Sequence, residues 1–264
     1  MTDKRIRILA LGDIVSRAGR KLPADQLKNI RTNYQVDFVI ANAENAATGN
    51  GLTPAIAKDL YASGVDFITL GDHVWRHKEL QGFLNLENQR CIRPENFPAG
   101  APGKGWAKFK IAGVNLGIIN LIGRVFLNTT LDCPFQAVDR IINEYLSDCR
   151  IICCDFHAEA TSEKNAMGHY LKDRASFVFG THTHVQTADQ RIISKTAYIS
   201  DLGMCGPAEG VIGMDFGRAI TRLRMGMPAG FQPAKGKVQI NGAIAEIDIS
   251  TGQAVSIERI NQTF

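Results

Sequence analysis

Side chains that can bind metal ions recur along the chain, each group placed where a run of apolar residues ends. Five groups stand at such positions: Gly12-Asp13, Asn42 to Asn45, Gly71-Asp72-His73, Asp155-Phe156-His157 and Gly180 to His184. Carboxylate, amide and imidazole donors in one set suit Mn, Fe or Zn better than Ca or a thiolate site. Ligands of an open α/β sheet bind beyond the carboxyl ends of its strands, so we expect these groups to converge on one crevice.

Each group taken alone has a plainer interpretation. An aspartate after a strand and a glycine often caps a helix or closes a turn, which applies to Asp13 and Asp72. Glu44 and Asn45 could be ordinary loop residues, and a lone His157 is more often a hydrogen-bonded core histidine than a ligand. Their occurrence in one ordered series favours a metal centre.

The histidines His182 and His184 are the hardest to explain without a metal, because two imidazoles near one locus are costly to bury. Besides His73, the candidate donors are Asp13, Glu44, Asn45, Asp72, His157, His182 and His184. A single tetrahedral zinc would use only about three or four of them. Two ions about 3.5–4 Å apart can share a carboxylate and clamp a phosphoryl group during in-line displacement. The number of donors therefore predicts two metals and phosphoryl chemistry.

The elements that must position these donors are those of an α/β fold, because apolar runs of strand length alternate with helical patterns. Strands are expected at 7–11, 38–41, 67–70, 106–111, 116–121, 151–154 and 177–179, and helices at 22–34, 54–63, 135–147 and 163–173. Segments 238–249 and 254–260 alternate apolar and polar residues around a turn, which predicts a terminal hairpin. The Gly- and Pro-rich stretches 93–105 and 203–217 are expected to be loops that frame a site or plain insertions.

Composition narrows the class of protein. The 264 residues are 45% apolar and carry a formal net charge of +4, which supports a sizeable core without the basic face of a DNA-binding protein. We find no low-complexity linker or internal repeat, so one domain over residues 1–264 is expected. No export signal or apolar run of membrane-spanning length is evident, which predicts a cytoplasmic protein with no membrane contact.

Cysteine usage and missing motifs add two further expectations. The 6 cysteines are irregularly spaced and are expected to be reduced, with Cys153 and Cys154 packed in the core on opposite faces of a strand. The chain has no nucleophile elbow, Walker-type phosphate loop or dinucleotide fingerprint. The common α/β functions that depend on these three motifs are thereby excluded.

The order GD, NAEN, GDH, DFHAEATSE and GTHTHVQTAD resembles the calcineurin-like metallophosphoesterases, and specifically their YmdB-like branch. The resemblance runs nearly end to end and includes RPENFPAGAPGKG at 93–105, INLIGRVF at 119–126, DLGMCGP at 201–207 and GMD at 213–215. It implies an α/β fold built as a layered sandwich of mixed β-sheets flanked by helices.

The resemblance also implies a division of the donors between two metal ions, with iron or manganese as the expected metals. One metal would be held by Asp13, Asn45 and His184, and the other by Asp72, His157 and His182, with Glu44 as the bridge. His73 would contact the phosphate and protonate the leaving oxygen as general acid, the alternative being a purely structural histidine.

The function that the resemblance implies is a dinuclear phosphodiesterase that hydrolyses small cyclic nucleotides such as 2′,3′-cyclic AMP or GMP through a metal-bridging hydroxide. The alternatives are a phosphomonoesterase or nucleotidase, and a catalytically weak sensor of metal or nucleotide that acts through a protein partner. A link to RNA-turnover proteins is implied, and a homo-oligomer is the default for a soluble enzyme of this size.

Two positions depart from the common pattern of the larger family. Many metallophosphoesterases have GNH where this chain has Gly71-Asp72-His73, so Asp72 adds a negative charge that should attract cations and repel an anionic substrate. Val15 stands where a histidine is usual two residues after the first aspartate, and Asn45 is expected to complete that metal's ligands.

Several polar and aromatic residues are expected to lie near the donors. Possible supporting contacts to the ligands or the substrate come from Arg93, Asn96, Glu159, Thr161, Ser162 and Glu163. Helix capping is an equal alternative for Thr161 and Ser162. Trp75 and Trp106 could stack on a base, although core packing is the commoner role of such residues.

Overall fold

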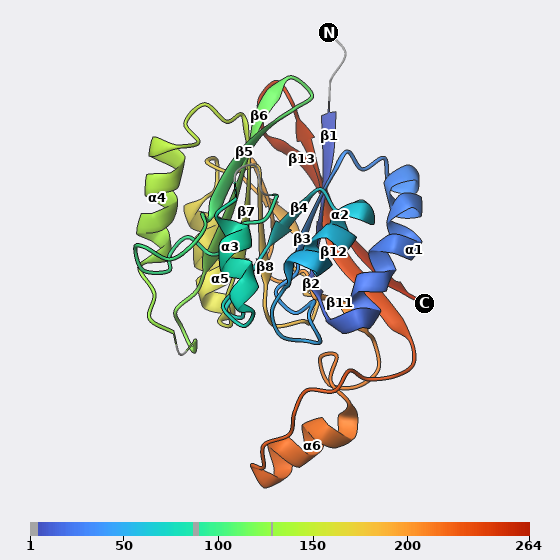
Figure 1. Cartoon of the computed structure of the whole chain (residues 1–264). Helices are drawn as coiled ribbons and strands as arrows, with labels where there is room; N and C mark the ends of the chain where they lie inside the picture. The colour runs from blue at the N-terminus through green and yellow to red at the C-terminus, as the bar shows by residue number, and fades with distance from the viewer. Residues whose placement is uncertain (1–4, 87–89, 128) are drawn as a thin grey trace.

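Two mixed β-sheets pack face to face and helices cover their outer faces (Figure 1). The computed structural model describes residues 5–86, 90–127 and 129–264. The first sheet has the strand order β2-β11-β12-β1-β3-β4, with β13 paired to β12, and the second has the order β5-β6-β7-β8-β10-β9. The expected layered sandwich of mixed sheets flanked by helices is confirmed.

The strands of each sheet have the following bounds. The first sheet contains β1 Arg5–Leu11, β2 Asp13–Ile14, β3 Phe38–Asn42, β4 Phe67–Thr69, β11 Met204–Pro207, β12 Val238–Asp248 and β13 Ala254–Thr263. The second contains β5 Trp106–Ile111, β6 Val114–Ile122, β7 Ile151–His157, β8 Phe177–Thr181, β9 Arg191–Ile193 and β10 Thr196–Ile199. The expected terminal hairpin is confirmed, because β12 and β13 pair antiparallel.

Five of the described helices each bury one face against a sheet. The first sheet is covered by α1 Ser16–Tyr34, α2 Pro54–Ala62 and α3 Lys78–Leu84, and the second by α4 Pro134–Glu144 and α5 Thr161–Tyr170. Between the sheets lies an apolar core that includes Ile8, Phe67 and Phe177. Cys153 belongs to this inner core and Cys154 to the outer cluster, as expected for neighbours in a strand, and the 6 cysteines are free thiols.

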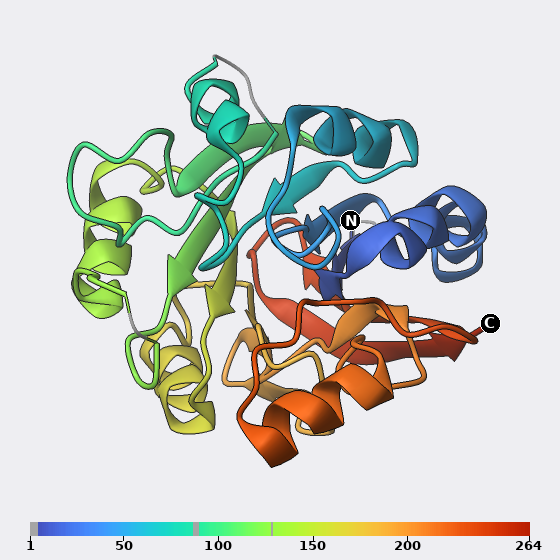
Figure 2. The same ribbon diagram turned by 60° about the horizontal axis from the view of Figure 1, so that its bottom comes forward.

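Parallel pairing places the carboxyl ends of the central strands at the same edge of both sheets. Strands β1, β3 and β4 run parallel in the first sheet, as do β6, β7, β8 and β10 in the second. Figure 2 turns this edge toward the viewer and shows the strand ends of both sheets around one central area. A site at this edge can therefore take side chains from both sheets.

Several elements differ from the sequence-based prediction. Helix α1 begins at Ser16 rather than Leu22, because Pro23 inside the helix interrupts the pattern by which a helix is recognised. Strands β7 and β8 continue to His157 and Thr181, so part of the polar motifs belongs to the strands themselves. The short strands β2, β9 and β10 and helix α3 were not predicted, since a few residues carry little periodicity.

The stretch 203–217 is not a simple loop, which corrects the prediction. It contains strand β11 and the start of helix α6, which spans Phe216–Met225. Asp215 caps α6 by accepting a hydrogen bond from the backbone N–H of Arg218, and Ala219 is the one buried residue of this fully described helix. The helix projects away from the sheets (Figure 1). None of the described helices combines the length and apolarity needed to cross a bilayer.

Candidate metal centre

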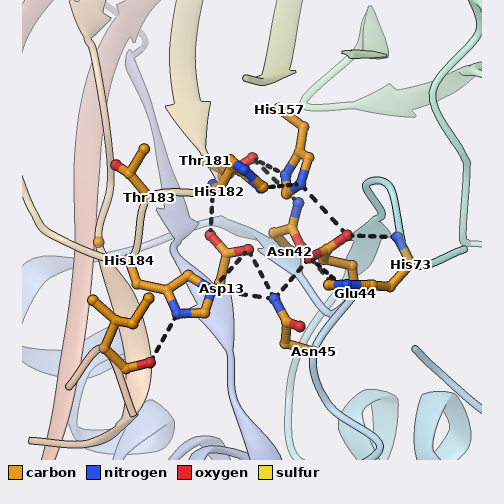
Figure 3. Close-up of polar contacts among 12 residues, drawn as sticks. Asp13, Asn42, Glu44, Asn45, His73, His157, Thr181, His182, Thr183 and His184 are labelled. Atoms are coloured by element: carbon orange, nitrogen blue, oxygen red, sulfur yellow. Dashed lines mark hydrogen bonds and ion pairs between the residues drawn. The ribbon is translucent and has the colours of Figure 1, made fainter. Parts of the chain in front are cut away.

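The donors predicted from the sequence meet between the carboxyl ends of the two sheets (Figure 3). Their chemistry divides by sheet. The oxygen-bearing side chains follow strands of the first sheet, and they are Asp13, Glu44, Asn45 and Asp72. The imidazoles end or follow strands of the second sheet, and they are His157, His182 and His184. The site therefore exists only where the two layers are packed together.

One set of donors surrounds a common point. Glu44, Asp72, His157 and His182 each offer a ligand atom, and these atoms lie within 4.8 Å of one another. Nε2 of His157 is 3.1 Å from Oδ1 of Asp72 and 3.4 Å from Oε2 of Glu44. Nδ1 of His182 lies 3.1 Å from the same His157 nitrogen. This cluster of carboxylates and imidazoles suits metal binding.

The remaining donors form a second set beside the first. Nδ2 of Asn45 is 3.5 Å from Oδ1 of Asp13 and 3.2 Å from Nε2 of His184, and the two latter atoms are 3.7 Å apart. The Asn45 amide directs its nitrogen toward these atoms, so coordination through its oxygen would require a half-turn of the amide group. Figure 3 shows the three side chains grouped on the side of the site away from His157.

Glu44 contacts both sets. Its Oε2 faces His157, whereas its Oε1 accepts a hydrogen bond of 2.7 Å from the Asn45 amide. The side chain is 1% exposed and follows β3, the central strand of the parallel run β1-β3-β4. Asp13 also contacts both sets, but differently: its Oδ1 faces the Asn45 amide, and its Oδ2 accepts only the backbone N–H of His182.

Each imidazole directs one nitrogen at the site and anchors the other on an oxygen. The anchors are the Thr181 hydroxyl for His157 (2.9 Å), the Glu159 carboxylate for His182 (3.0 Å) and the Ile212 carbonyl for His184 (3.1 Å). Metal-binding histidines characteristically donate their second N–H to such an oxygen, which fixes the tautomer and the ring plane. The donor set therefore fits a metal on grounds of orientation as well as composition.

The backbone is shaped to bring these side chains together. His182 has φ 100° and His184 φ 64°, in the region that non-glycine residues rarely adopt. Gly71 lines the opposite wall, and a Cβ there would lie 2.3 Å from both Oε2 of Glu44 and Nε2 of His157. The position of Gly71 thus leaves space that any larger residue would fill.

Electrostatics explains how three carboxylates share a buried site. Within the described residues, the ion-pair partners of Asp13, Glu44 and Asp72 are histidines. Burial alone would lower the pKa of His157, but the negative charges of Glu44, Asp13 and Asp72 outweigh it and raise that pKa to about 10. The site thus concentrates negative charge that a cation would compensate.

Burial also opposes ionisation of the carboxylates, with different outcomes. At Glu44 the charge of His157 and the hydrogen bond from His73 outweigh burial, so its pKa is lowered. At Asp72 contact with His157 has the same effect and lowers the pKa well below its usual range. At Asp13 burial dominates and raises the pKa.

His73 lies at the open side of the site. Its backbone N–H donates to Oε2 of Glu44 and its Nδ1 lies 3.0 Å from Oε1, while Nε2 is 3.7 Å from Oδ2 of Asp72. The side chain is 26% exposed, so Nε2 can meet a ligand. Burial would lower the pKa of His73, but the hydrogen bond and charge of Glu44 raise it overall, which favours an imidazole that carries a proton to donate.

A buried network behind His157 was not predicted. Asp155, which is fully buried, accepts hydrogen bonds from Asn42, Thr69 and Thr181 at 3.1, 2.5 and 2.8 Å. Burial raises the pKa of Asp155 to about 6. Because side chains two residues apart share a face of a strand, the spacing of Asp155 and His157 was a usable signal. The residues that bond to Asp155 lie on other strands, so no sequence pattern indicated these contacts.

Of the supporting residues predicted from the sequence, some contact the donors and others hold neighbouring backbone. Glu159 contacts His182, whereas Glu163 accepts the backbone N–H groups of Arg124 and Val125. Arg93 and Asn96 hold loops through backbone carbonyl and amide groups, such as those of Gly103 and Ile122. The N-cap of α5 is Ala160, so capping by Thr161 or Ser162 is wrong.

The two tryptophans pack against the protein core, which was the alternative to stacking on a base. Trp75 contacts Phe97 edge to face with ring centroids 5.3 Å apart, and Trp106 stacks on Tyr145 at 4.5 Å. Both indoles pack against core clusters of the described residues, which accounts for their apolar surface without a nucleobase.

Comparison with known proteins assigns the family. The sequence pattern of YmdB-like proteins matches residues 9–260. The chain belongs to the YmdB-like family. It is 48% identical over 256 residues to the 2′,3′-cyclic-nucleotide 2′-phosphodiesterase of Bacillus subtilis (strain 168), a match that spans 97% of this chain and 96% of that protein.

Solved structures of similar length share the fold over nearly the whole chain. A novel phosphatase from Mycoplasma pneumoniae superposes with a TM-score of 0.93 at 35% identity, covering 99% of this chain and 95% of that one. A hypothetical protein from Thermus thermophilus gives a TM-score of 0.90 at 38% identity, covering 98% and 99%. The predicted resemblance and the predicted class, a phosphoric ester hydrolase, are confirmed.

Proposed function

We propose that this YmdB-like chain is a dinuclear metal-dependent phosphodiesterase that hydrolyses small cyclic nucleotides such as 2′,3′-cyclic AMP or GMP. The observation that carries the proposal is the orientation of three imidazoles, each anchored by one nitrogen and directed by the other at a shared group of carboxylates. The substrate class is supported by the Bacillus subtilis relative, which is named for that activity.

The proposal assigns one metal to Asp72, His157 and His182 and the other to Asp13, Asn45 and His184, with Glu44 between them. The two sets of short distances, and the contacts of Glu44 to both, support this division. When bound, two such ions would polarise the phosphoryl oxygens and lower the pKa of a bound water. Iron and manganese are the metals we propose, because both accept mixed oxygen and imidazole ligands.

The residues of the chain supply orientation and a proton. Glu44 holds Nδ1 of His73 and so presents Nε2 to the open side of the site. We propose that this nitrogen donates a proton to the departing ribose oxygen, a step that commonly contributes about 10²- to 10⁴-fold to rate. The raised pKa of His73 supports a protonated imidazole before the reaction.

The test is release of a nucleoside monophosphate from 2′,3′-cyclic AMP by protein reconstituted with Mn or Fe. A Glu44→Gln variant should lose nearly all turnover, because it removes charge from the side chain that contacts both donor sets. The control is Glu79→Gln, the same change at an exposed position of α3, which should keep full activity. Absence of turnover with any cyclic or model diester would contradict the proposal.

A phosphomonoesterase is the second candidate, because the Mycoplasma pneumoniae relative is described as a phosphatase. The same ligand set could bind either a diester or a monoester. Rates with p-nitrophenyl phosphate and bis-p-nitrophenyl phosphate separate the two functions. Tight nucleotide binding without turnover of either compound would instead favour a sensor that acts through a partner.

Elemental analysis of the purified chain, expressed as metal per protomer, tests the number and identity of the ions.

We also propose a single domain over residues 1–264, a cytoplasmic location and a homo-oligomeric state. A partner in RNA turnover is part of the same proposal.

A further inference from the structure

A buried ion pair lies behind the turn that carries two of the candidate ligands. Nζ of Lys164, in α5, is 2.6 Å from Oδ2 of Asp201, and the two side chains are 3% and 2% exposed. A buried pair of this kind repays its desolvation only with excellent geometry, and replacing it by apolar residues is often neutral for stability. Because such a pair contributes little net stability, its place next to the site points to a role beyond holding the fold.

Asp201 is a centre of hydrogen bonds rather than half of an isolated pair. Its Oδ2 also accepts the backbone N–H of Thr183 at 3.1 Å and the Thr183 hydroxyl at 2.7 Å. Its Oδ1 accepts the backbone N–H of Gly203 at 2.7 Å. Thr183 stands between His182 and His184, so Asp201 holds the middle of the turn whose ends are the two imidazoles.

The contacts of Asp201 extend to the first sheet and close a circuit. The Gly203 carbonyl accepts the backbone N–H of Asp13 at 3.1 Å, and Oδ2 of Asp13 accepts the backbone N–H of His182 at 3.1 Å. Starting at Asp201, the circuit thus passes through Gly203, Asp13, His182 and Thr183 and returns. It joins one oxygen donor of the first sheet to the turn that bears two nitrogen donors of the second.

Two glycines allow the parts of this circuit to approach one another. A Cβ on Gly12 would lie 2.1 Å from the Gly203 carbonyl oxygen. A Cβ on Gly180 would lie 1.9 Å from the Ser200 carbonyl oxygen and 2.9 Å from Cδ of Lys164. Side chains at these positions would push the Asp201 segment away from the site.

We propose that Lys164 and Asp201 are positioning residues that set the distance between Asp13 and the histidines His182 and His184. Lys164 neutralises Asp201 and holds its Oδ2, while Asp201 fixes Thr183 and Gly203 and, through them, both donor sets. Asp201 bonds to Thr183 and Gly203 and not to the candidate ligands themselves, so the pair acts on those ligands through the backbone. The inference rests on the proposed function, because the quantity that the pair controls is the geometry of the metal ligands.

The test compares near-isosteric variants of the full chain. Thr183→Val removes the hydroxyl bond to Asp201, and Thr183→Ser keeps it. Asp201→Asn and Lys164→Met each remove one charge of the pair, and the double variant removes both. Lys108→Met is the control, because Lys108 and Asp148 form an ion pair that is 38% and 55% exposed. Lys108 pairs with Gly117 in the first half of β6, whereas the donors lie at the carboxyl ends of the strands.

The first measurement is affinity for Mn²⁺, by competition with a chelating dye. We expect Asp201→Asn and Thr183→Val to weaken Mn²⁺ binding about 10- to 100-fold, the usual effect of losing contacts that orient metal ligands. Thr183→Ser and Lys108→Met should bind as the wild type does. At saturating Mn²⁺, kcat for 2′,3′-cyclic AMP should fall in the first two variants while KM stays within about 2-fold, because substrate contacts are unaltered.

The outcomes separate the proposals. If Asp201→Asn and Thr183→Val bind Mn²⁺ and turn over substrate as the wild type does, or lose only resistance to urea, the Lys164–Asp201 pair is structural. This inference is then overturned, while the proposed function stands. Wild-type protein that binds no Mn²⁺ would overturn the proposed function and this inference with it. Thr183→Val keeps the test decisive if the charge variants fail to fold.

Discussion

His157 and Thr181 share a hydrogen bond that fixes which imidazole nitrogen faces the metal site. Nδ1 of His157 lies 2.9 Å from the Thr181 hydroxyl oxygen, and that hydroxyl donates its proton to Oδ1 of Asp155 at 2.8 Å. A hydroxyl has one proton, so Thr181 must accept from the N–H of His157. Nε2 is therefore the nitrogen that points at Glu44 and Asp72.

Removal of this hydroxyl should loosen His157. We expect Thr181→Val to weaken metal affinity about 10- to 100-fold, because the ring loses the acceptor that sets its plane and tautomer. The buried Asp155 also loses a donor, which should reduce the free energy of unfolding by about 1–3 kcal/mol. Chelator competition and urea unfolding measure the two effects. Thr181→Ser keeps the hydroxyl and serves as the control, so equal losses in both variants would contradict this explanation.

Metal affinity should rise with pH across the neutral range. The pKa of His157 in the chain without a cation is raised to about 10, so its Nε2 carries a proton at neutral pH. A metal must displace that proton, and binding should tighten about 10-fold for each pH unit gained below the pKa. Calorimetric titration in buffers with different ionisation enthalpies counts the protons released. Binding that is independent of pH across the neutral range would contradict the assignment of His157 as a ligand.

Loss of His73 should affect substrates according to their leaving group. We expect His73→Gln to lower kcat for 2′,3′-cyclic AMP about 10²- to 10⁴-fold, since the departing ribose oxygen needs a proton. The rate with bis-p-nitrophenyl phosphate should fall much less, because p-nitrophenolate can depart unprotonated. His77→Gln is the matched control, as His77 bonds to the Asn50 carbonyl and not to the donors. A uniform loss with both substrates would favour a structural role for His73.

Replacement of Asp72 should weaken metal binding and strengthen binding of the anionic substrate. Asp72→Asn keeps an oxygen ligand but removes a negative charge that contacts His157 at 3.1 Å. We expect the variant to lose metal faster on dialysis and to show a lower KM for the anionic substrate, because repulsion at the site is reduced. Metal content and KM are the measurements. Asp59→Asn, at an exposed position of α2, provides the control.

The sequence was sufficient to predict the layered α/β fold and the convergence of the donors, because each donor follows a strand that can be recognised by its apolar run. It could not reveal the contacts behind them. Lys164 and Asp201 are separated by 37 positions, and no periodic pattern links a lysine in a helix with an aspartate after a strand. The left-handed backbone at His182 likewise depends on tertiary hydrogen bonds that no local preference indicates.

Helix α6 was missed for a different reason. Its apolar residues Phe216, Ile220 and Leu223 recur at helical spacing, but glycines on both sides made the segment resemble a loop. These three side chains remain 63%, 37% and 74% exposed, so the pattern did not mark a buried face. Periodicity identifies a helix most securely when one of its faces is packed against the protein, and α6 lacks that support among the described residues.

The separation of donor types between the two sheets has a consequence for how the protein fails under stress. Neither half of the sandwich holds a complete ligand set, so a bound cation cross-links the halves through bonds that neither makes alone. Filling the site should raise the temperature at which the halves come apart, by an amount that grows with free metal concentration. Activity should therefore be lost as soon as the two sheets separate, because the ligand set is complete only while they are in contact.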